Sequence, residues 1–317
     1  MIVASNLTKR YGDKTAVDDL SFTIKPGIVT GFLGPNGAGK STTMRMIMGL
    51  DAPTSGSVTV NGKPYNQHAA PLHEVGALLE AKAIHTGRSA RNHLLALAAT
   101  TGIGARRVDE VIDLVGLREV ARKRAGGFSL GMGQRLGIAS ALLGDPATVL
   151  LDEPVNGLDP EGILWIRNLL KGLASEGRTV FVSSHLMSEM ALTAEHLIVV
   201  GRGRPIADTS VEEFTRSASR NVVRVRSPHA DRLAGLLVGP DVAVESAEPG
   251  TLEVTGLESD RIGTIAAEHG ITLFELAPQQ ASLEEAFMEL TRDAVEYHAS
   301  TTVAGSGESA GTGRITA

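Results

Sequence analysis

The sequence predicts an α/β protein with two domains, in which a larger N-terminal domain of alternating strands and helices precedes a small α+β domain. Short β-rich runs alternate with helical stretches over the first two thirds of the 317 residues. Within that region a glycine-rich loop joins a buried apolar run to a helix. The charge balance then changes: residues 1–216 carry 23 basic and 21 acidic side chains, whereas residues 217–317 carry 7 and 15.

Composition limits the chemistry and the location of the chain. It has no cysteine, which excludes disulfides, thiol nucleophiles and thiolate metal sites. No run of about 18 apolar residues occurs, and the first residues lack the apolar stretch of a signal peptide. We therefore expect a soluble, cytoplasmic chain without a membrane span. The acidic C-terminal third also disfavours a nucleic-acid-binding face, because phosphate contacts need clustered Lys and Arg.

Apolar runs and turn signals predict the elements of the first domain. The expected strands cover residues 16–24, 28–33, 57–60, 148–151 and 179–183. The expected helices cover residues 41–48, 93–99, 108–115 and a stretch that starts at Pro160, and the whole region 89–143 is expected to be mostly helical. An Asn-Gly turn after residue 60 predicts that the strand over 57–60 is one arm of a hairpin.

The C-terminal third predicts the order βαββαβ, which is compatible with a small ferredoxin-like domain. These elements are expected at 222–225, 231–238, 242–244, 252–254, 259–268 and 271–276. The run Ser282-Leu283-Glu284-Glu285 is typical of a capping box, and it predicts a helix that continues to about Tyr297. We therefore expect a first domain over 1–216, an accessory domain over 217–298 and a disordered tail over 299–317.

The glycine-rich loop carries the phosphate-binding pattern GxxxxGK[ST] in full. It reads Gly34, Pro35, Asn36, Gly37, Ala38, Gly39, Lys40 and Ser41, with Thr42 next in the helix. Glycines let several backbone N–H groups face a phosphate, and the following helix adds its positive end. Lys40 can reach the β- and γ-phosphates, while the Ser41 hydroxyl suits Mg²⁺. The pattern predicts binding of ATP with Mg²⁺.

A pair of carboxylates follows the apolar strand over 148–151. Asp152 at the end of that strand is a candidate magnesium ligand, because magnesium prefers carboxylate and water oxygens. Hydrolysis also requires a group that orients or deprotonates water, and Glu153 is the candidate. The pair alone is weak evidence for a nucleotide site, but together with Lys40 upstream in the chain it is strong evidence.

Taken together, these motifs resemble those of the ATP-binding subunits of ABC transporters, over residues 1 to about 215. The loop resembles the Walker A motif and Asp152-Glu153 the end of Walker B with its catalytic glutamate. The run Phe128-Ser129-Leu130-Gly131-Met132 stands at the signature position, and Asn156-Gly157-Leu158-Asp159 resembles the D-loop. The resemblance implies that His185 is the switch histidine, acting in catalysis with Glu153 and Lys40. It also implies that Tyr11 stacks on adenine.

Some positions depart from the family pattern. Leu130 and Met132 replace a glycine and a glutamine of the signature, and Glu80 stands where the Q-loop glutamine is expected. We expect Glu80 to accept a hydrogen bond from metal-bound water, as a third magnesium-site residue with Ser41 and Asp152. Both departures, and the later run Ser282–Phe287, resemble the daunorubicin- and bacitracin-type antibiotic efflux branch. That resemblance implies an exporter of drug-like compounds.

The resemblance also implies partners. Two copies of the chain would enclose ATP head to tail, with Ser129 and Gly131 of one copy facing the phosphates held by the other. Ser129 can also cap its own helix, and both roles are compatible. A separate membrane permease would carry the cargo, so the chain is expected at the cytoplasmic side of the membrane as a peripheral subunit, without nucleic acid. Two alternatives stay open: a soluble ABC ATPase acting on ribosomes or DNA, and a nucleotide-binding regulator without hydrolysis.

Overall fold

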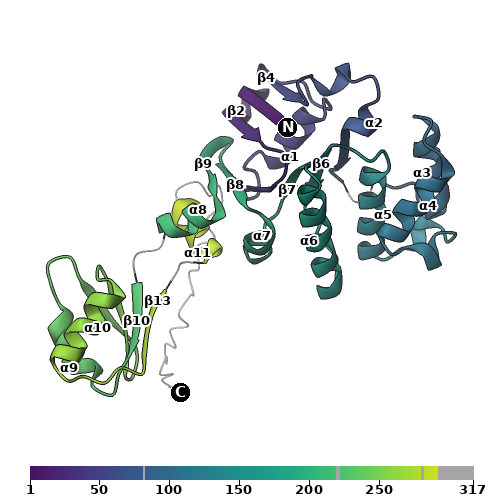
Figure 1. The fold of residues 1–317 in the computed structure, drawn as a ribbon. Helices are drawn as coiled ribbons and strands as arrows, with labels where there is room; N and C mark the ends of the chain where they lie inside the picture. Colours follow the sequence, from purple (N-terminus) through teal and green to yellow (C-terminus); the bar gives the residue numbers. More distant parts are fainter. Residues whose placement is uncertain (81–82, 219–221, 280–281, 292–317) are drawn as a thin grey trace, which may run out of the picture.

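The computed structural model describes residues 1–80, 83–218, 222–279 and 282–291. Its first domain is built on a six-stranded sheet with the order β5-β6-β7-β3-β8-β9. The strands are parallel except for the antiparallel pair β8 and β9. They cover Val75–Leu78 (β5), Thr148–Asp152 (β6), Thr179–Ser183 (β7), Val29–Leu33 (β3), His196–Gly201 (β8) and Arg204–Ser210 (β9). Figure 1 shows this sheet at the centre of the larger domain.

A second, antiparallel sheet lies over one face of the first. It has the order β2-β1-β4, with β1 at Ile2–Tyr11, β2 at Lys14–Ile24 and β4 at Ser55–Val60. Between the sheets, Phe22, Phe32 and Phe181 form a cluster of aromatic rings with centroids 5.0–6.1 Å apart. Helix α1 (Lys40–Ile47) contributes Met44, Met46 and Ile47 to the same core. The phosphate loop is thus anchored between two packed layers.

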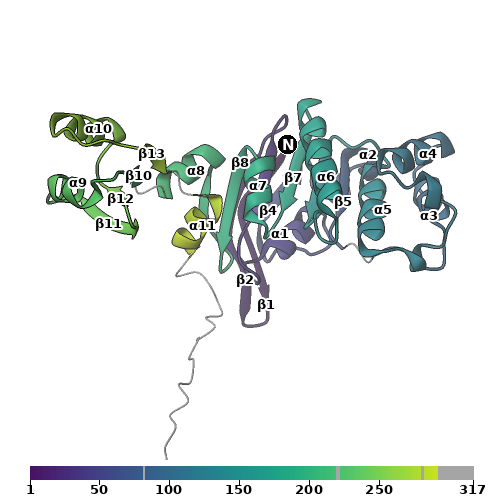
Figure 2. The same cartoon turned by 90° about the horizontal axis from the view of Figure 1, so that it is seen from below.

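The helices of the first domain gather in two places. Around the other face of the large sheet lie α6 (Pro160–Ser175) and α7 (Met187–Thr193), as Figure 1 shows. To the side of the sheet, α3 (Ala90–Ala99), α4 (Ala105–Leu114) and α5 (Leu130–Leu142) pack on one another and form the helical subdomain (Figure 2). Shorter turns of helix cover Tyr65–Gln67, Pro71–Glu74 (α2), Arg118–Val120 and Ala125–Gly127.

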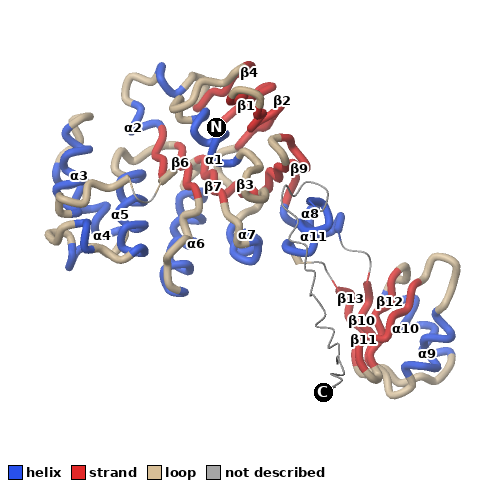
Figure 3. Tube along the Cα trace, turned by 180° about the vertical axis from the view of Figure 1, so that it is seen from behind, coloured by secondary structure: helices blue, strands red, loops and turns tan. Residues whose placement is uncertain are grey.

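The accessory domain confirms the βαββαβ order. Its sheet has the order β11-β12-β10-β13, and every neighbouring pair is antiparallel. This is the split βαβ topology of a ferredoxin-like domain. The elements are β10 (Val222–Arg226), α9 (Ala230–Leu237), β11 (Ala243–Glu248), β12 (Thr251–Thr255), α10 (Ser259–Glu268) and β13 (Glu275–Gln279). Figure 3 shows this domain apart from the larger one.

Three expectations on local structure need correction. The expected strands include none before residue 16, yet β1 is the central strand of the second sheet. The strand over 55–60 pairs with β1 and not with a following arm; only the Val60–Lys63 bridge closes the Asn-Gly turn. The last strand starts at Glu275 and not at Ile271, because the Ile271 N–H donates to Ala266 at the end of α10.

Helix α11 (Leu283–Thr291) returns to the larger domain. It packs against α8 (Val211–Ala218) and α7, and its buried residues join the core of the first domain. The capping box is confirmed, since the Glu285 N–H donates to Ser282 Oγ and the Ser282 N–H donates to Glu285 Oε2. Its expected place is in the accessory domain over 217–298, whereas its packing joins it to the larger domain. Its expected end at Tyr297 and the tail over 299–317 lie outside the described residues.

Candidate active site

The phosphate loop runs from the end of β3 to the start of α1, as the sequence predicts. Lys40 is the first residue of α1 and is 8% exposed; its Nζ donates to the carbonyl oxygens of Gly34 (2.6 Å) and Pro35 (3.2 Å). Burial lowers the pKa of Lys40, and the charges of Glu153 and Asp152 oppose that effect. The loop therefore holds a desolvated ammonium group where phosphate oxygens would lie.

Two glycines of this loop are required by geometry. Gly39 has φ +98°, and a Cβ on it would lie 2.5 Å from the carbonyl oxygen of Ala16. A Cβ on Gly34 would lie 2.5 Å from the carbonyl oxygen of Val200. The loop can adopt this conformation only because both positions lack a side chain.

Asp152 is brought to the loop by strand pairing. It lies at the carboxyl end of β6, in register with Ser183 of the neighbouring β7. Ser41 Oγ, 111 residues away in sequence, donates to Asp152 Oδ2 at 2.9 Å. Ser183 Oγ donates to the other carboxylate oxygen. The hydroxyl of the loop and the carboxylate of the strand thus meet as the sequence predicts.

Glu153 and His185 form a second pair of side chains, next to Asp152 and Ser183. His185 Nδ1 lies 2.6 Å from Glu153 Oε2, so the two groups share a hydrogen bond. Glu153 has φ +51°, an unusual conformation for a residue with a side chain. Its backbone N–H donates to Ser183 Oγ at 3.0 Å, and its carbonyl accepts from the buried Gln134 side chain at 3.2 Å. These contacts hold the carboxylate at the mouth of the loop.

Two residues that contact this site, Ser183 and Gln134, are not among those predicted from the sequence. Ser183 ends a predicted buried strand next to the strand of Asp152, and the shared sheet edge was the available signal. Gln134 lies inside α5, and its contact with Glu153 depends on the packing of that helix, so no local pattern indicates it.

A cavity of about 410 Å³ lies above the loop. Its lining includes Tyr11, residues 36–42 of the loop and α1, and both Asp152 and Glu153. Tyr11 is 48% exposed, and its hydroxyl donates to Asp51 at 3.0 Å. Lys9 Nζ lies 4.9 Å from the centre of its ring. These contacts hold the ring at the rim of the cavity.

The signature residues lie outside this cavity. Ser129 is exposed and caps α5, accepting from the Met132 N–H at 3.2 Å, which agrees with the capping role given to it. A Cβ on Gly131 would lie 2.8 Å from the carbonyl oxygen of Gly157 in the D-loop segment. The chain therefore does not bring its own Ser129 and Gly131 to its own phosphate loop.

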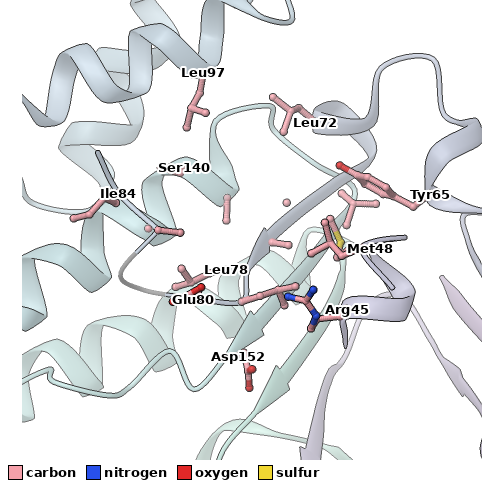
Figure 4. A pocket seen from close by; sticks show the side chains of 18 of the residues that line it. Arg45, Met48, Tyr65, Leu72, Leu78, Glu80, Ile84, Leu97, Ser140 and Asp152 are labelled. Carbon is pink, nitrogen blue, oxygen red and sulfur yellow. The ribbon is translucent and has the colours of Figure 1, made fainter. Parts of the chain in front are cut away.

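Glu80 belongs to a neighbouring groove of about 600 Å³ rather than to the cavity of the phosphate loop. The groove lies between the sheet and the helical subdomain, and Figure 4 shows Glu80 in it together with Arg45 and Asp152. Most of the lining is apolar, from residues such as Met48, Leu72, Leu78, Ile84 and Leu97. Ser41 and Asp152 line both spaces, so the groove adjoins the carboxylate end of the site.

The donor set fits a hard cation. Within the ranges that the structure describes, no three His, Asp or Glu side chains gather into a metal-binding group. The Ser41 hydroxyl and the Asp152 carboxylate supply two adjacent oxygen ligands, which suits magnesium that keeps waters and phosphate oxygens as its other ligands.

Comparisons with known proteins agree with this geometry. Residues 17–156 match the ABC transporter family, and residues 221–284 match a domain family of unknown function. The bacitracin transport ATP-binding protein BcrA of Bacillus licheniformis is 35% identical over 92% of this chain and 97% of that protein. The chain belongs to the ATP-binding proteins of ABC transporters. Within this family, it also resembles the linearmycin resistance ATP-binding protein LnrL of Bacillus subtilis, 31% identical over 92% of this chain and 98% of that protein.

Solved structures support the same assignment for the first domain. A dimeric ATP-binding cassette bound to ADP and Pi matches 67% of this chain and 99% of its own length, with a TM-score of 0.61 and 26% identity. As an ABC ATP-binding protein, the chain has the fold of an ATPase cassette followed by the accessory domain. Across the described ranges, no helix has the length and apolar character needed to cross a bilayer.

Proposed function

We propose that this chain is the ATP-hydrolysing subunit of an exporter that moves a drug-like or antibiotic compound through a separate permease. One observation carries the proposed ATPase activity. A connected set of hydrogen bonds lies beside Lys40 and joins Ser41, Asp152, Ser183, Glu153 and His185. The cargo class is supported by the relatives, which are named for transport of, or resistance to, bacitracin, lantibiotics and linearmycin.

The proposed roles follow from position. Lys40 and the backbone N–H groups of the loop would bind the β- and γ-phosphates, and Tyr11 would stack on the base. Mg²⁺ would supply positive charge beside the phosphates, held by Ser41 and Asp152, with Glu80 near its water shell. Glu153 would orient the attacking water, and His185 would hold that carboxylate and contact the γ-phosphate.

A second copy of the chain would complete the site. Ser129 is exposed at the amino end of α5, a thirteen-residue helix, where an anion can accept from free N–H groups. Because the chain's own signature residues lie outside its own cavity, we propose that they close on the ATP held by the other copy. Loss of the γ-phosphate after hydrolysis would then release the pair.

The permease would contact the groove beside Glu80. An apolar groove of about 600 Å³ that shares Ser41 and Asp152 with the nucleotide cavity suits a short helical segment of a membrane partner. Contact there would place the chain at the cytoplasmic face of the membrane as a peripheral subunit.

The test is the variant Glu153→Gln. We expect it to bind ATP as wild type does, to accumulate as a dimer with ATP, and to release phosphate at least about a hundredfold more slowly, because the water loses its general base. Phosphate release, nucleotide binding and size-exclusion chromatography measure these effects, with the exposed Glu119→Gln as the matched control.

Wild-type turnover in Glu153→Gln would contradict the role of Glu153. The transport role is checked separately, by identifying what co-purifies with the chain from native membranes. We expect a multi-spanning membrane protein. Salt-sensitive nucleic-acid binding without such a partner would favour the ribosome or DNA alternative.

A further inference from the structure

His185 is a half-exposed side chain whose position depends on the segment that carries it. Its side chain is 53% exposed, against 22% for its partner Glu153. On one side the segment is fixed by Ser183 in β7, which bonds Asp152. On the other side α7 begins two residues later, at Met187. The His185 N–H also donates to Glu153 Oε2 at 3.3 Å, so both the backbone and the ring of His185 meet this carboxylate. A shift of α7, which follows directly, would move both contacts.

Helix α7 has only seven residues and is held by its neighbours. On its inner side Met190 packs on β3, and a Cβ on Gly31 would lie 2.6 Å from its sulfur. Toward α6, Glu189 pairs with Arg167 at 2.6 Å. A helix this short has little stability of its own, so these contacts set its position.

Helix α7 is also held by a helix at the end of the described chain. Helix α11 packs against α7 and α8, an arrangement visible in Figures 1 and 3. Its residues Leu283 (3% exposed), Ala286 (0%) and Phe287 (8%) are buried in the cluster that also contains Met187 and Met190. The capping box at Ser282 fixes where this helix starts. The side chains that support α7 therefore include residues about a hundred positions downstream of it.

We propose that Phe287 is a positioning residue for His185, acting through α7. The proposal rests on the catalytic role proposed above for Glu153 and His185. Phe287 is the largest side chain that α11 buries in this cluster. Helix α11, which buries this ring, packs against both α8 and α7, so removing the ring leaves space in the packing around these helices. A shift of α7 into that space would lose or misdirect the hydrogen bond between His185 and Glu153. The core that surrounds the phosphate loop, between the two sheets, contains no described residue of α11 or α7, so the loop is expected to keep its geometry.

The experiment compares Phe287→Ala with Met288→Ala in the full chain. Met288 is the next residue of α11 and is 64% exposed, so it controls for any change in the helix. We expect Phe287→Ala to lower kcat about tenfold, as misplacement of a catalytic group does, while the dissociation constant for ATP stays within about twofold. Phe287→Leu, which keeps most of the volume, is expected to lower kcat by about two- to threefold.

A double-mutant cycle with His185→Ala separates positioning from general destabilisation. If Phe287 acts through His185, adding Phe287→Ala to His185→Ala lowers kcat no further. A further drop in that background, or weakened ATP binding by either Phe287 variant, would overturn the proposal. Should Phe287→Ala fail to fold, Phe287→Leu in the same cycle decides. Full turnover in His185→Ala alone would instead contradict the proposed function.

Discussion

The phosphate loop and the signature segment each lie at the amino end of a helix, but in different surroundings. Lys40 at the start of α1 is 8% exposed, and its ammonium group already donates to two carbonyl oxygens of its own loop. Ser129 at the start of α5 is exposed, and its hydroxyl caps its own helix. Within one chain, Lys40 of the phosphate loop is thus buried and hydrogen-bonded, whereas Ser129 of the signature segment lies on the surface. We therefore expect that mutation can separate nucleotide binding from nucleotide turnover.

On the side of the signature segment, a large effect is expected from Ser129→Arg. A bulky cation there blocks the approach of a second copy, so turnover should fall by about a hundredfold, comparable to loss of one preorganised donor. ATP binding to a single chain should stay within about twofold, because Lys40 and Tyr11 are untouched. Phosphate release and ATP titration measure the two effects.

The matched control is Ser89→Arg. Ser89 caps α3 by accepting from the Asn92 N–H at 3.2 Å, the same distance as in the Ser129 cap. Both variants lose a helix cap, worth about 1 kcal/mol of stability. Equal losses of turnover in the two would mean that Ser129 matters only as a cap, and the proposed contrast between the two regions would be gone.

On the side of the phosphate loop, a smaller effect on stability and on ATP affinity is expected from a change in pH. Burial lowers the pKa of Lys40 below its ordinary 10.5 in the folded, nucleotide-free chain. Between that lowered value and 10.5 the unfolded chain binds more protons, so the contribution of Lys40 to the free energy of unfolding rises with pH in that window. ATP affinity should fall over the same window, because the ammonium group is lost.

Lys40→Met serves as the reference in that titration, since it removes the group that titrates. We expect this pH dependence of ATP affinity in the wild type and its absence in the variant. An identical pH dependence in both would show that another group is responsible.

The sequence predicted what local pattern and strand order determine. The phosphate loop is contiguous, and Asp152 follows a buried strand, so their meeting through Ser41 could be expected. The place of β1 in the second sheet could not, because its partners β2 and β4 are chosen by tertiary packing. The same holds for Gln134 beside Glu153 and for Phe287 near α7, where side chains distant in sequence meet only after the helices have packed.

ATP titration of Lys40→Ala against wild type, in the presence of Mg²⁺, is the direct test of the proposed phosphate site. The loop and the carboxylates are proposed to hold one magnesium-bound triphosphate, with Lys40 as the full charge on it. Loss of a charge-assisted hydrogen bond worth about 1.5–3 kcal/mol predicts a dissociation constant for ATP that is roughly ten- to hundredfold larger. Turnover is expected to be close to zero. Unchanged affinity and turnover in Lys40→Ala would contradict the account.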